Sequence, residues 1–177
     1  MKKTIRIGFV SALTLLFLSS TTGAQGTRAS PAATASGKTQ GGASITIDYS
    51  SPAVKGRKIW GELVPYDKVW RAGANEATLI ATDKDVSVEG KALPAGKYSL
   101  YAIPGEKEWI IIINSATGQW GINRGDGTTT EDPAKDVLRV TVKPVNCPEF
   151  NERLVYMVDT NGFSLFWENL RIPVSVK

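Results

Sequence analysis

The chain has 177 residues, with 21 Lys and Arg against 17 Asp and Glu, a single cysteine and no histidine. The lack of histidine excludes Ser-His and Cys-His catalytic pairs, histidine-based zinc or copper sites and a histidine pH switch. Because Cys147 has no second cysteine to pair with, an intrachain disulfide is excluded and a hydrophobic core must hold the fold.

The N-terminus has the organisation of a secretory signal peptide. Three basic residues lie within the first six, residues 7–18 are apolar but too short to span a bilayer, and small residues follow. We therefore predict a Sec-type signal peptide over residues 1–24, with cleavage after Ala24. Export would end in the periplasm or the medium, with no transmembrane anchor after cleavage.

The basic excess belongs mainly to this segment. Removing residues 1–24 takes away three basic and no acidic residues, which leaves a net charge of +1. Nucleic-acid binding needs basic residues gathered on one face of the mature chain, so a nucleic-acid partner is not expected.

Residues 25–43 contain no large apolar side chain and are rich in Gly, Ala, Ser and Thr. Such a segment buries too little surface to offset its conformational entropy, and we predict a disordered linker there. The 134 residues from 44 to 177 suit one domain with one core.

Within residues 44–177, short alternating segments are separated by turn residues. In the first segment, Ile45, Ile47 and Tyr49 alternate with polar residues, as in a half-buried strand. Strands are expected over 44–50, 77–82, 86–88, 97–103, 109–114, 137–142, 154–158, 163–167 and 172–176. This spacing, without an amphipathic helix, predicts an all-β, antiparallel β-sandwich of jelly-roll-like type.

Three details sharpen this prediction. Residues 109–114 are apolar on both faces, which is typical of a strand inside a sheet. Asn161-Gly162 predicts a hairpin with a type I′ turn, and Pro173 indicates an edge strand. Trp109 and Trp167 are expected in the core.

The densest chemistry lies in residues 57–85, which hold the candidate site. A planar guanidinium, an amide and a carboxylate on a glycine-containing loop can converge on a polar ligand, and nearby aromatic rings can offer apolar faces to a sugar. The candidate ligand-binding residues are Trp60, Tyr66, Trp70, Arg71, Asn75 and Glu76. They predict a non-catalytic binding module for a polar or carbohydrate-like small ligand.

Two other functions remain open. In the first, Arg71 pairs with Glu76 or an aspartate to lock a long loop, and the domain is a structural or interaction module whose partner is an envelope protein. In the second, Glu76 is the acid or base of a hydrolase. No catalytic residue, cofactor or metal is assigned, because the acidic segments 83–85 and 123–127 each contain a cation and fit turns better than calcium loops.

Two surface features are also candidates for contact with a partner. Lys55, Arg57 and Lys58 form a basic cluster at a turn, which is typical of a solvated rim and could attract an anionic polysaccharide. Trp120 lies on a glycine-rich loop and is the best candidate for an exposed binding aromatic.

The order of motifs resembles a known family. The motifs are Gly56–Gly61, Leu63–Tyr66, Trp70–Thr78, Leu93–Leu100 and Trp109–Asn114. Over residues 44–177 they make the chain similar to the secreted bacterial family called domain of unknown function 2911. The resemblance implies export and a compact domain, and it supplies no catalytic residues.

Overall fold

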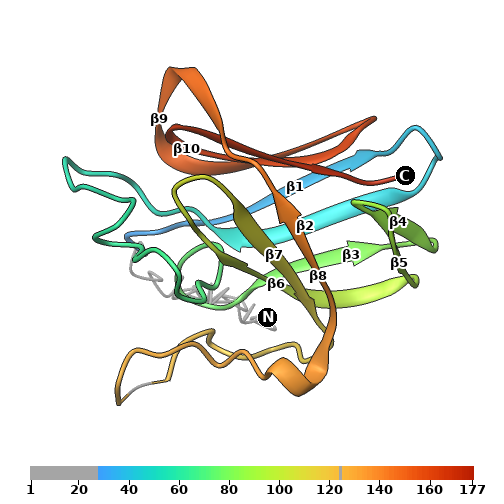
Figure 1. Ribbon diagram of the computed structural model, residues 1–177, viewed down its shortest axis with the longest axis horizontal. Helices are drawn as coiled ribbons and strands as arrows, with labels where there is room; N and C mark the ends of the chain where they lie inside the picture. Colours follow the sequence, from blue (N-terminus) through green and yellow to red (C-terminus); the bar gives the residue numbers. More distant parts are fainter. Residues whose placement is uncertain (1–27, 124) are drawn as a thin grey trace, which may run out of the picture.

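The structure is a computed structural model that describes residues 28–123 and 125–177, and it is dominated by β-strands (Figure 1). One 3₁₀ turn, η1 at Pro133–Lys135, accompanies ten strands in the described residues. The strands are β1 (Ala32–Lys38), β2 (Ser44–Ser50), β3 (Thr78–Thr82), β4 (Val86–Val88), β5 (Lys91–Leu93), β6 (Gly96–Ile103), β7 (Trp109–Asn114), β8 (Asp136–Val142), β9 (Val145–Asp159) and β10 (Gly162–Ser175). Every ladder between them is antiparallel, which confirms the all-β, antiparallel prediction.

Six strands form the main sheet, in the order β1-β2-β3-β6-β7-β8. The alternation of β2 places Ile45 and Ile47 in the core. β7 pairs with β6 on one edge and β8 on the other, and it is apolar on both faces because each face meets a hydrophobic cluster. The prediction that this strand lies inside a sheet is confirmed.

A second layer, formed by β9 and β10, covers one face of the main sheet (Figure 1). β10 turns back on itself at Glu168, where φ is 51°, so that the backbone N–H of Val176 donates to Asn161 at 2.8 Å. β4 and β5 pair separately, and Val88 bridges Val176. The strands therefore divide into sheets of six, two and two, an unequal division compared with the two equal sheets of a jelly roll.

The hairpin between β9 and β10 is confirmed, but its predicted turn is wrong. Asp159 pairs with Gly162, so the central residues are Thr160 and Asn161, and neither has a positive φ. The Asp159 carboxylate instead accepts from the Asn161 N–H at 2.7 Å. Glycine is required at 162 because φ is 140° and a Cβ there would collide with the backbone of the returning β10.

The opposite face of the main sheet carries a smaller cluster of Ala77, Tyr101 and Ile112. The loop between β7 and β8 crosses beneath it (Figure 1). From this loop, Gln119 donates its side-chain amide to the Tyr101 hydroxyl at 2.9 Å. The loop is therefore held against the sheet, and it also reaches the candidate site described below.

The predicted linker over residues 25–43 is wrong where the structure describes it. Residues 32–38 form β1, which pairs along its whole length with β2. Small residues permit close packing here, because a Cβ at Gly37 would lie 2.8 Å from the Val158 carbonyl oxygen of β9. The same small residues that indicated disorder are those that let an edge strand fit under β9. The predicted signal peptide and residues 25–27 lie outside the described residues.

Candidate functional site

Most of the candidate run, up to Ala77, forms the long connection from β2 to β3. It winds around one end of the two layers, coloured cyan to green in Figure 1. Isolated bridges join Trp60 to Val64 and Trp70 to Ala102, but no regular strand forms between Ser51 and Ala77. Because the backbone turns repeatedly, neighbouring side chains of the run point to different parts of the molecule.

Trp60 belongs to the core, in a cluster of four tryptophans. Its ring centroid lies 5.9 Å from Trp70, 5.0 Å from Trp109 and 5.6 Å from Trp167, with interplanar angles of 69–85°. The indole N–H groups of Trp60, Trp109 and Trp167 are buried without an oxygen or nitrogen partner. T-shaped pairs aim a ring edge at a neighbouring π face, which can accept an indole N–H. The prediction that Trp109 and Trp167 are core residues is confirmed.

The turn from Arg71 to Glu76 is held by several independent contacts. Ala72 and Asn75 have φ of 52° and 57°, a left-handed conformation that is costly for alanine. The Ala72 carbonyl accepts from the hydroxyls of Thr78 at 3.0 Å and Tyr156 at 2.8 Å. A Cβ at Gly73 would lie 2.7 Å from the Thr78 hydroxyl. The surrounding structure therefore determines this backbone conformation, as expected where strain is retained.

Asn75 and Glu76 bind the segment that precedes β1. Asn75 donates its amide to the Ser30 carbonyl at 3.0 Å, and Arg28 donates to both oxygens of the Glu76 carboxylate at 2.7 and 2.9 Å. Hydrogen bonds from its own backbone N–H and from Arg28 lower the pKa of Glu76. Glu76 is thus an exposed, ionised ion-pair partner, and the predicted Arg71–Glu76 salt bridge is not among the pairs that the described residues make.

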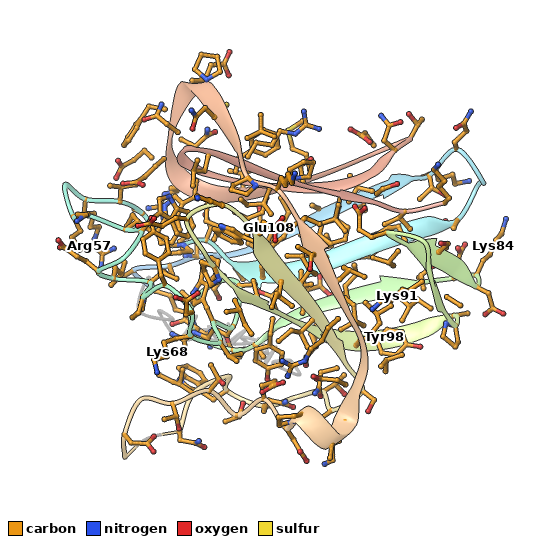
Figure 2. The ribbon with its side chains drawn as sticks, in the orientation of Figure 1. Arg57, Lys68, Lys84, Lys91, Tyr98 and Glu108 are labelled. Carbon is orange, nitrogen blue, oxygen red and sulfur yellow. The ribbon has the colours of Figure 1, made fainter. Side chains whose placement is uncertain are left out.

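Trp70 and Arg71 line a common cavity of about 320 Å³, called the Trp70–Arg71 cavity below. Its other walls come from the same connection, from the β7–β8 loop, from β10 and from Ser30 before β1. They include Val64, Pro65, Lys68, Val69, Ile122, Thr129 and Trp167. Arg57 and Lys68 also line it, and both lie at this end of the molecule in Figure 2. Among the described residues that line it there is no acidic side chain, so the cavity combines apolar and polar walls with positive charge.

The Arg71 side chain is half-buried, and few hydrogen bonds compensate for the lost hydration of its charge. Desolvation lowers the pKa of its guanidinium, and the negative charge of Glu76 opposes that effect. The Trp120 carbonyl accepts from Arg71 at 3.5 Å, a long contact, and no carboxylate of the described chain lies within 4.0 Å of Arg71. Most of its five N–H donors are therefore available to a ligand.

Tyr66 and Trp120 lie outside this cavity. Tyr66 packs over Gly61, where a Cβ would be 3.0 Å from its ring, and it borders an open groove with Asp67 and Lys107. Trp120 is 44% exposed, in agreement with the expectation of an exposed aromatic, and it contributes a backbone carbonyl to Arg71. Of the six predicted site residues, the structure brings only Trp70 and Arg71 together around one cavity.

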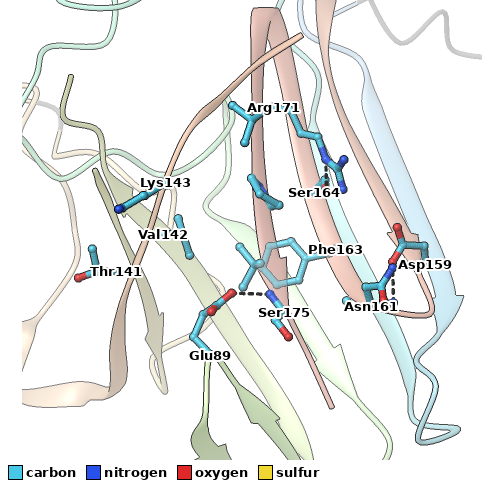
Figure 3. Close-up of a pocket in the computed structure, with 14 residues that line it drawn as sticks. Glu89, Thr141, Val142, Lys143, Asp159, Asn161, Phe163, Ser164, Arg171 and Ser175 are labelled. Atoms are coloured by element: carbon cyan, nitrogen blue, oxygen red, sulfur yellow. Dashed lines mark hydrogen bonds between the residues drawn. The ribbon is translucent and has the colours of Figure 1, made fainter. Parts of the chain in front are cut away.

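A second cavity of about 410 Å³ lies between β8 and β10 (Figure 3). Three of its four charged side chains, those of Glu89, Asp159 and Arg171, bind the chain itself, whereas Lys143 makes no side-chain hydrogen bond or ion pair with the described residues. The Glu89 carboxylate accepts from the Ser175 N–H at 2.5 Å, and Arg171 donates to the Ser164 hydroxyl at 3.1 Å while its guanidinium lies over Phe166. Because most of these groups already have partners, this cavity offers a ligand less than the Trp70–Arg71 cavity does.

Sequence reasoning missed Lys68 and the β7–β8 loop as parts of the site. Lys68 lies two residues before Trp70. The sequence feature that could have pointed to it is the number of cationic residues in the connection. Ile122 and Thr129 had no signal, because they reach the cavity only through the contact of their loop with the sheet. Arg57 was assigned to a solvated rim, whereas its guanidinium donates to the carbonyls of Ala53 and Val54 and borders the cavity.

Comparison with known proteins gives the class of this domain. A family model described as protein of unknown function (DUF2911) matches residues 30–176. The match spans the β-domain from just before β1 to β10. The chain belongs to this family, which confirms the predicted resemblance. No curated protein and no solved structure matches the chain.

Within the described part of the chain, no helix has the length and apolar character needed to cross a bilayer. Over the same residues, no three side chains of His, Cys, Asp or Glu gather as a metal site would require.

Proposed function

We propose that the protein is an exported, non-catalytic module that binds a polar or carbohydrate-like small ligand in the Trp70–Arg71 cavity. The observation that carries this proposal is the pairing of an apolar aromatic wall with a half-buried guanidinium whose donors are largely unused. Small-ligand sites are clefts of about 300–1,000 Å³ in which apolar walls accompany placed polar groups, and this cavity, at about 320 Å³, has the size of such a site and both kinds of group. Its walls come from four segments of the chain: the residues before β1, the β2–β3 connection, the β7–β8 loop and β10.

Binding is tested by titrating a panel of mono- and oligosaccharides into the purified protein and measuring heat. Arg71→Ala and Trp70→Ala should abolish binding of any ligand found, while Trp120→Phe and Glu76→Gln should leave it unchanged. Chemical denaturation of each variant shows whether the fold survives. Binding by wild type that persists in both cavity variants would contradict the proposed site.

The main alternative is a structural or protein-interaction module of the cell envelope. The contacts of Asn75 and Glu76 with residues 28–30 favour it, because they show that part of the run locks a neighbouring segment. In that function, Arg71→Ala would change no small-molecule affinity, and a pull-down from envelope extract would recover one protein stoichiometrically.

A hydrolase that uses Glu76 is favoured less. A general acid near neutral pH needs a raised pKa, whereas the Arg28 contact and a backbone N–H lower that of Glu76. Its carboxylate is held outside the Trp70–Arg71 cavity. Turnover of a glycoside or ester panel by wild type, lost in Glu76→Gln, would restore this alternative.

A further inference from the structure

The charges around the Trp70–Arg71 cavity have one sign. Arg57, Lys68 and Arg71 line it, and no aspartate or glutamate of the described part of the chain does. Across the whole chain, basic and acidic residues are nearly balanced, at 21 and 17, so this segregation is not a consequence of composition. Where aromatic and aliphatic side chains form part of the walls, they lower the effective dielectric and strengthen the attraction of an anion.

Arg71 also stands apart from the other arginines that the structure describes. Arg139 bonds to Glu131 and Asp136, each at 2.6 Å, and Arg28 bonds to Glu76. Arg57 and Arg153 donate to backbone carbonyls, and Arg171 donates to Ser164. Within residues 28–123 and 125–177, the Arg71 side chain has only the 3.5 Å contact with the Trp120 carbonyl, although burial already penalises its charge.

The backbone that carries Arg71 is fixed before any ligand arrives. The Thr78 N–H donates to the Arg71 carbonyl at 3.4 Å, and the Ala74 N–H donates to Ser50 at 3.3 Å. The side chain also packs against Gly121, where a Cβ would lie 2.8 Å from Arg71 Cδ. A pre-positioned guanidinium loses little further freedom on binding, which favours bidentate recognition of an oxyanion.

We propose that the ligand of the Trp70–Arg71 cavity is an anion, in which a carboxylate or phosphate oxyanion pairs with Arg71 and an adjoining ring lies against Trp70. This proposal rests on the proposed function and narrows its ligand class. Arg71 supplies the fork of donors, Lys68 adds a mobile point charge at the exposed rim, and the Trp70 indole supplies the apolar face. Arg57 adds a further positive charge, and two of its five N–H donors already bind the carbonyls of Ala53 and Val54.

The test compares four probes in calorimetric titrations of the purified protein: glucose, glucuronic acid, glucose 6-phosphate and inorganic phosphate. An acidic sugar should bind at least about tenfold more tightly than glucose, and its affinity should fall as salt rises from about 0.1 M to about 1 M, which shortens the Debye length from about 10 Å to about 3 Å. Glucuronic acid against glucose 6-phosphate distinguishes a carboxylate from a phosphate source. Inorganic phosphate shows whether the sugar ring of the ligand is needed for binding.

Arg71→Gln should reduce the affinity for the acidic sugar at least about tenfold, and Arg71→Lys should lose part of it because lysine keeps the charge without the fork. Lys55→Gln, which removes a charge outside the cavity, is the matched control. Near-UV circular dichroism of the tryptophan cluster reports whether each variant is folded. The salt dependence of wild type gives a readout that needs no variant.

The outcomes separate the two proposals. Equal binding of glucose and glucuronic acid, unaffected by Arg71→Gln but lost in Trp70→Ala, overturns the anionic ligand and leaves the binding module standing. Binding of none of the four probes to folded wild type overturns both. Binding of glucose 6-phosphate that disappears in Lys55→Gln but persists in Arg71→Gln would assign the anion to the outer basic turn and overturn the inference.

Discussion

The buried hydroxyl of Tyr156 donates a 2.8 Å hydrogen bond to the Ala72 carbonyl oxygen, 84 residues earlier in the chain. Burial raises the pKa of Tyr156 well above its ordinary value, so the group stays a neutral donor. Tyr156 comes from β9 in the second layer, and Ala72 is the residue after Arg71. The bond therefore ties the second layer to the turn that presents Arg71 to the cavity.

Tyr156→Phe should lower the free energy of unfolding by about 0.5–1.5 kcal/mol, the net value of one hydrogen bond. The loss stays in this range because the Ala72 carbonyl keeps its bond from Thr78. Urea denaturation measures it. Tyr98→Phe is the control, since its hydroxyl bonds to the Pro94 carbonyl at an exposed position. An equal loss in the two variants would contradict the special role of Tyr156.

Gly121→Ala should weaken ligand binding, whereas Gly118→Ala should not. Both glycines have left-handed backbones, with φ of 89° and 83°, so alanine costs each about 1–2 kcal/mol of stability. A Cβ at 121 would also meet Arg71 Cβ at 3.0 Å and Cδ at 2.8 Å, while nothing lies within 4 Å of a Cβ at 118.

Denaturation and titration of the two glycine variants, with any ligand that wild type binds, separate backbone strain from displacement of Arg71. The stability losses should be greater for Gly121→Ala, and only this variant should lose affinity. Unchanged affinity in Gly121→Ala would show that the position of Arg71 does not matter for binding.

Asn75→Ala should destabilise the protein by about 1–2 kcal/mol more than Asn75→Gly, because only glycine adopts its φ of 57° without strain. Both variants lose the bond to the Ser30 carbonyl, so their difference isolates the backbone term. Thermal or urea unfolding measures both. Equal stability of Asn75→Ala and Asn75→Gly would show that the backbone at position 75 changes its conformation once the Asn75 side-chain amide is removed.

The strands of the main sheet could be predicted because their signals are local. Ile45 and Ile47 alternate with polar residues, and Trp109 to Ile113 are all apolar, so period and burial agree. The edge strand Ala32–Lys38 was missed because its stability comes from pairing with β2 and from packing under β9. A flexible tether and a closely packed edge strand can both consist of small residues. Only the neighbouring strand against which the segment packs distinguishes the two.

The candidate site was predicted in part for a similar reason. The sequence placed Trp70, Arg71, Asn75 and Glu76 close together along the chain, but the left-handed residues Ala72 and Asn75 reverse the backbone between them. Arg71 therefore faces the cavity, and Glu76 faces Arg28. A high local density of aromatic and polar residues marks a segment as a candidate site. The direction of each side chain depends on backbone dihedral angles, which composition does not give.

Beneath the main sheet, one arginine bridges two acidic side chains. Arg139 donates to Glu131 and to Asp136 at 2.6 Å each, and Asn114 donates to Asp136 at 2.7 Å. Glu131 is almost fully buried, with a side-chain exposure of 5%. Burial, followed by the nearby negative charge of Asp136, raises the pKa of Glu131, while Arg139 opposes the shift. The cluster anchors the end of the β7–β8 loop next to β8.

A raised folded-state pKa means that, between the unfolded and folded values, the native protein binds more protons than the unfolded chain, so the stability due to Glu131 falls as pH rises. It is fully present below the ordinary value of 4.5 and is lost as pH passes the raised pKa. The difference in unfolding free energy between wild type and the Glu131→Gln variant should therefore decrease as the pH rises from about 4 to about 7. Urea denaturation at steps of about half a pH unit measures this difference. Glu62→Gln, which removes an exposed carboxylate paired with Lys58, should give a difference below about 1 kcal/mol throughout. A wild-type advantage that grew with pH would show that Arg139 outweighs burial and that Glu131 is ionised in the folded protein.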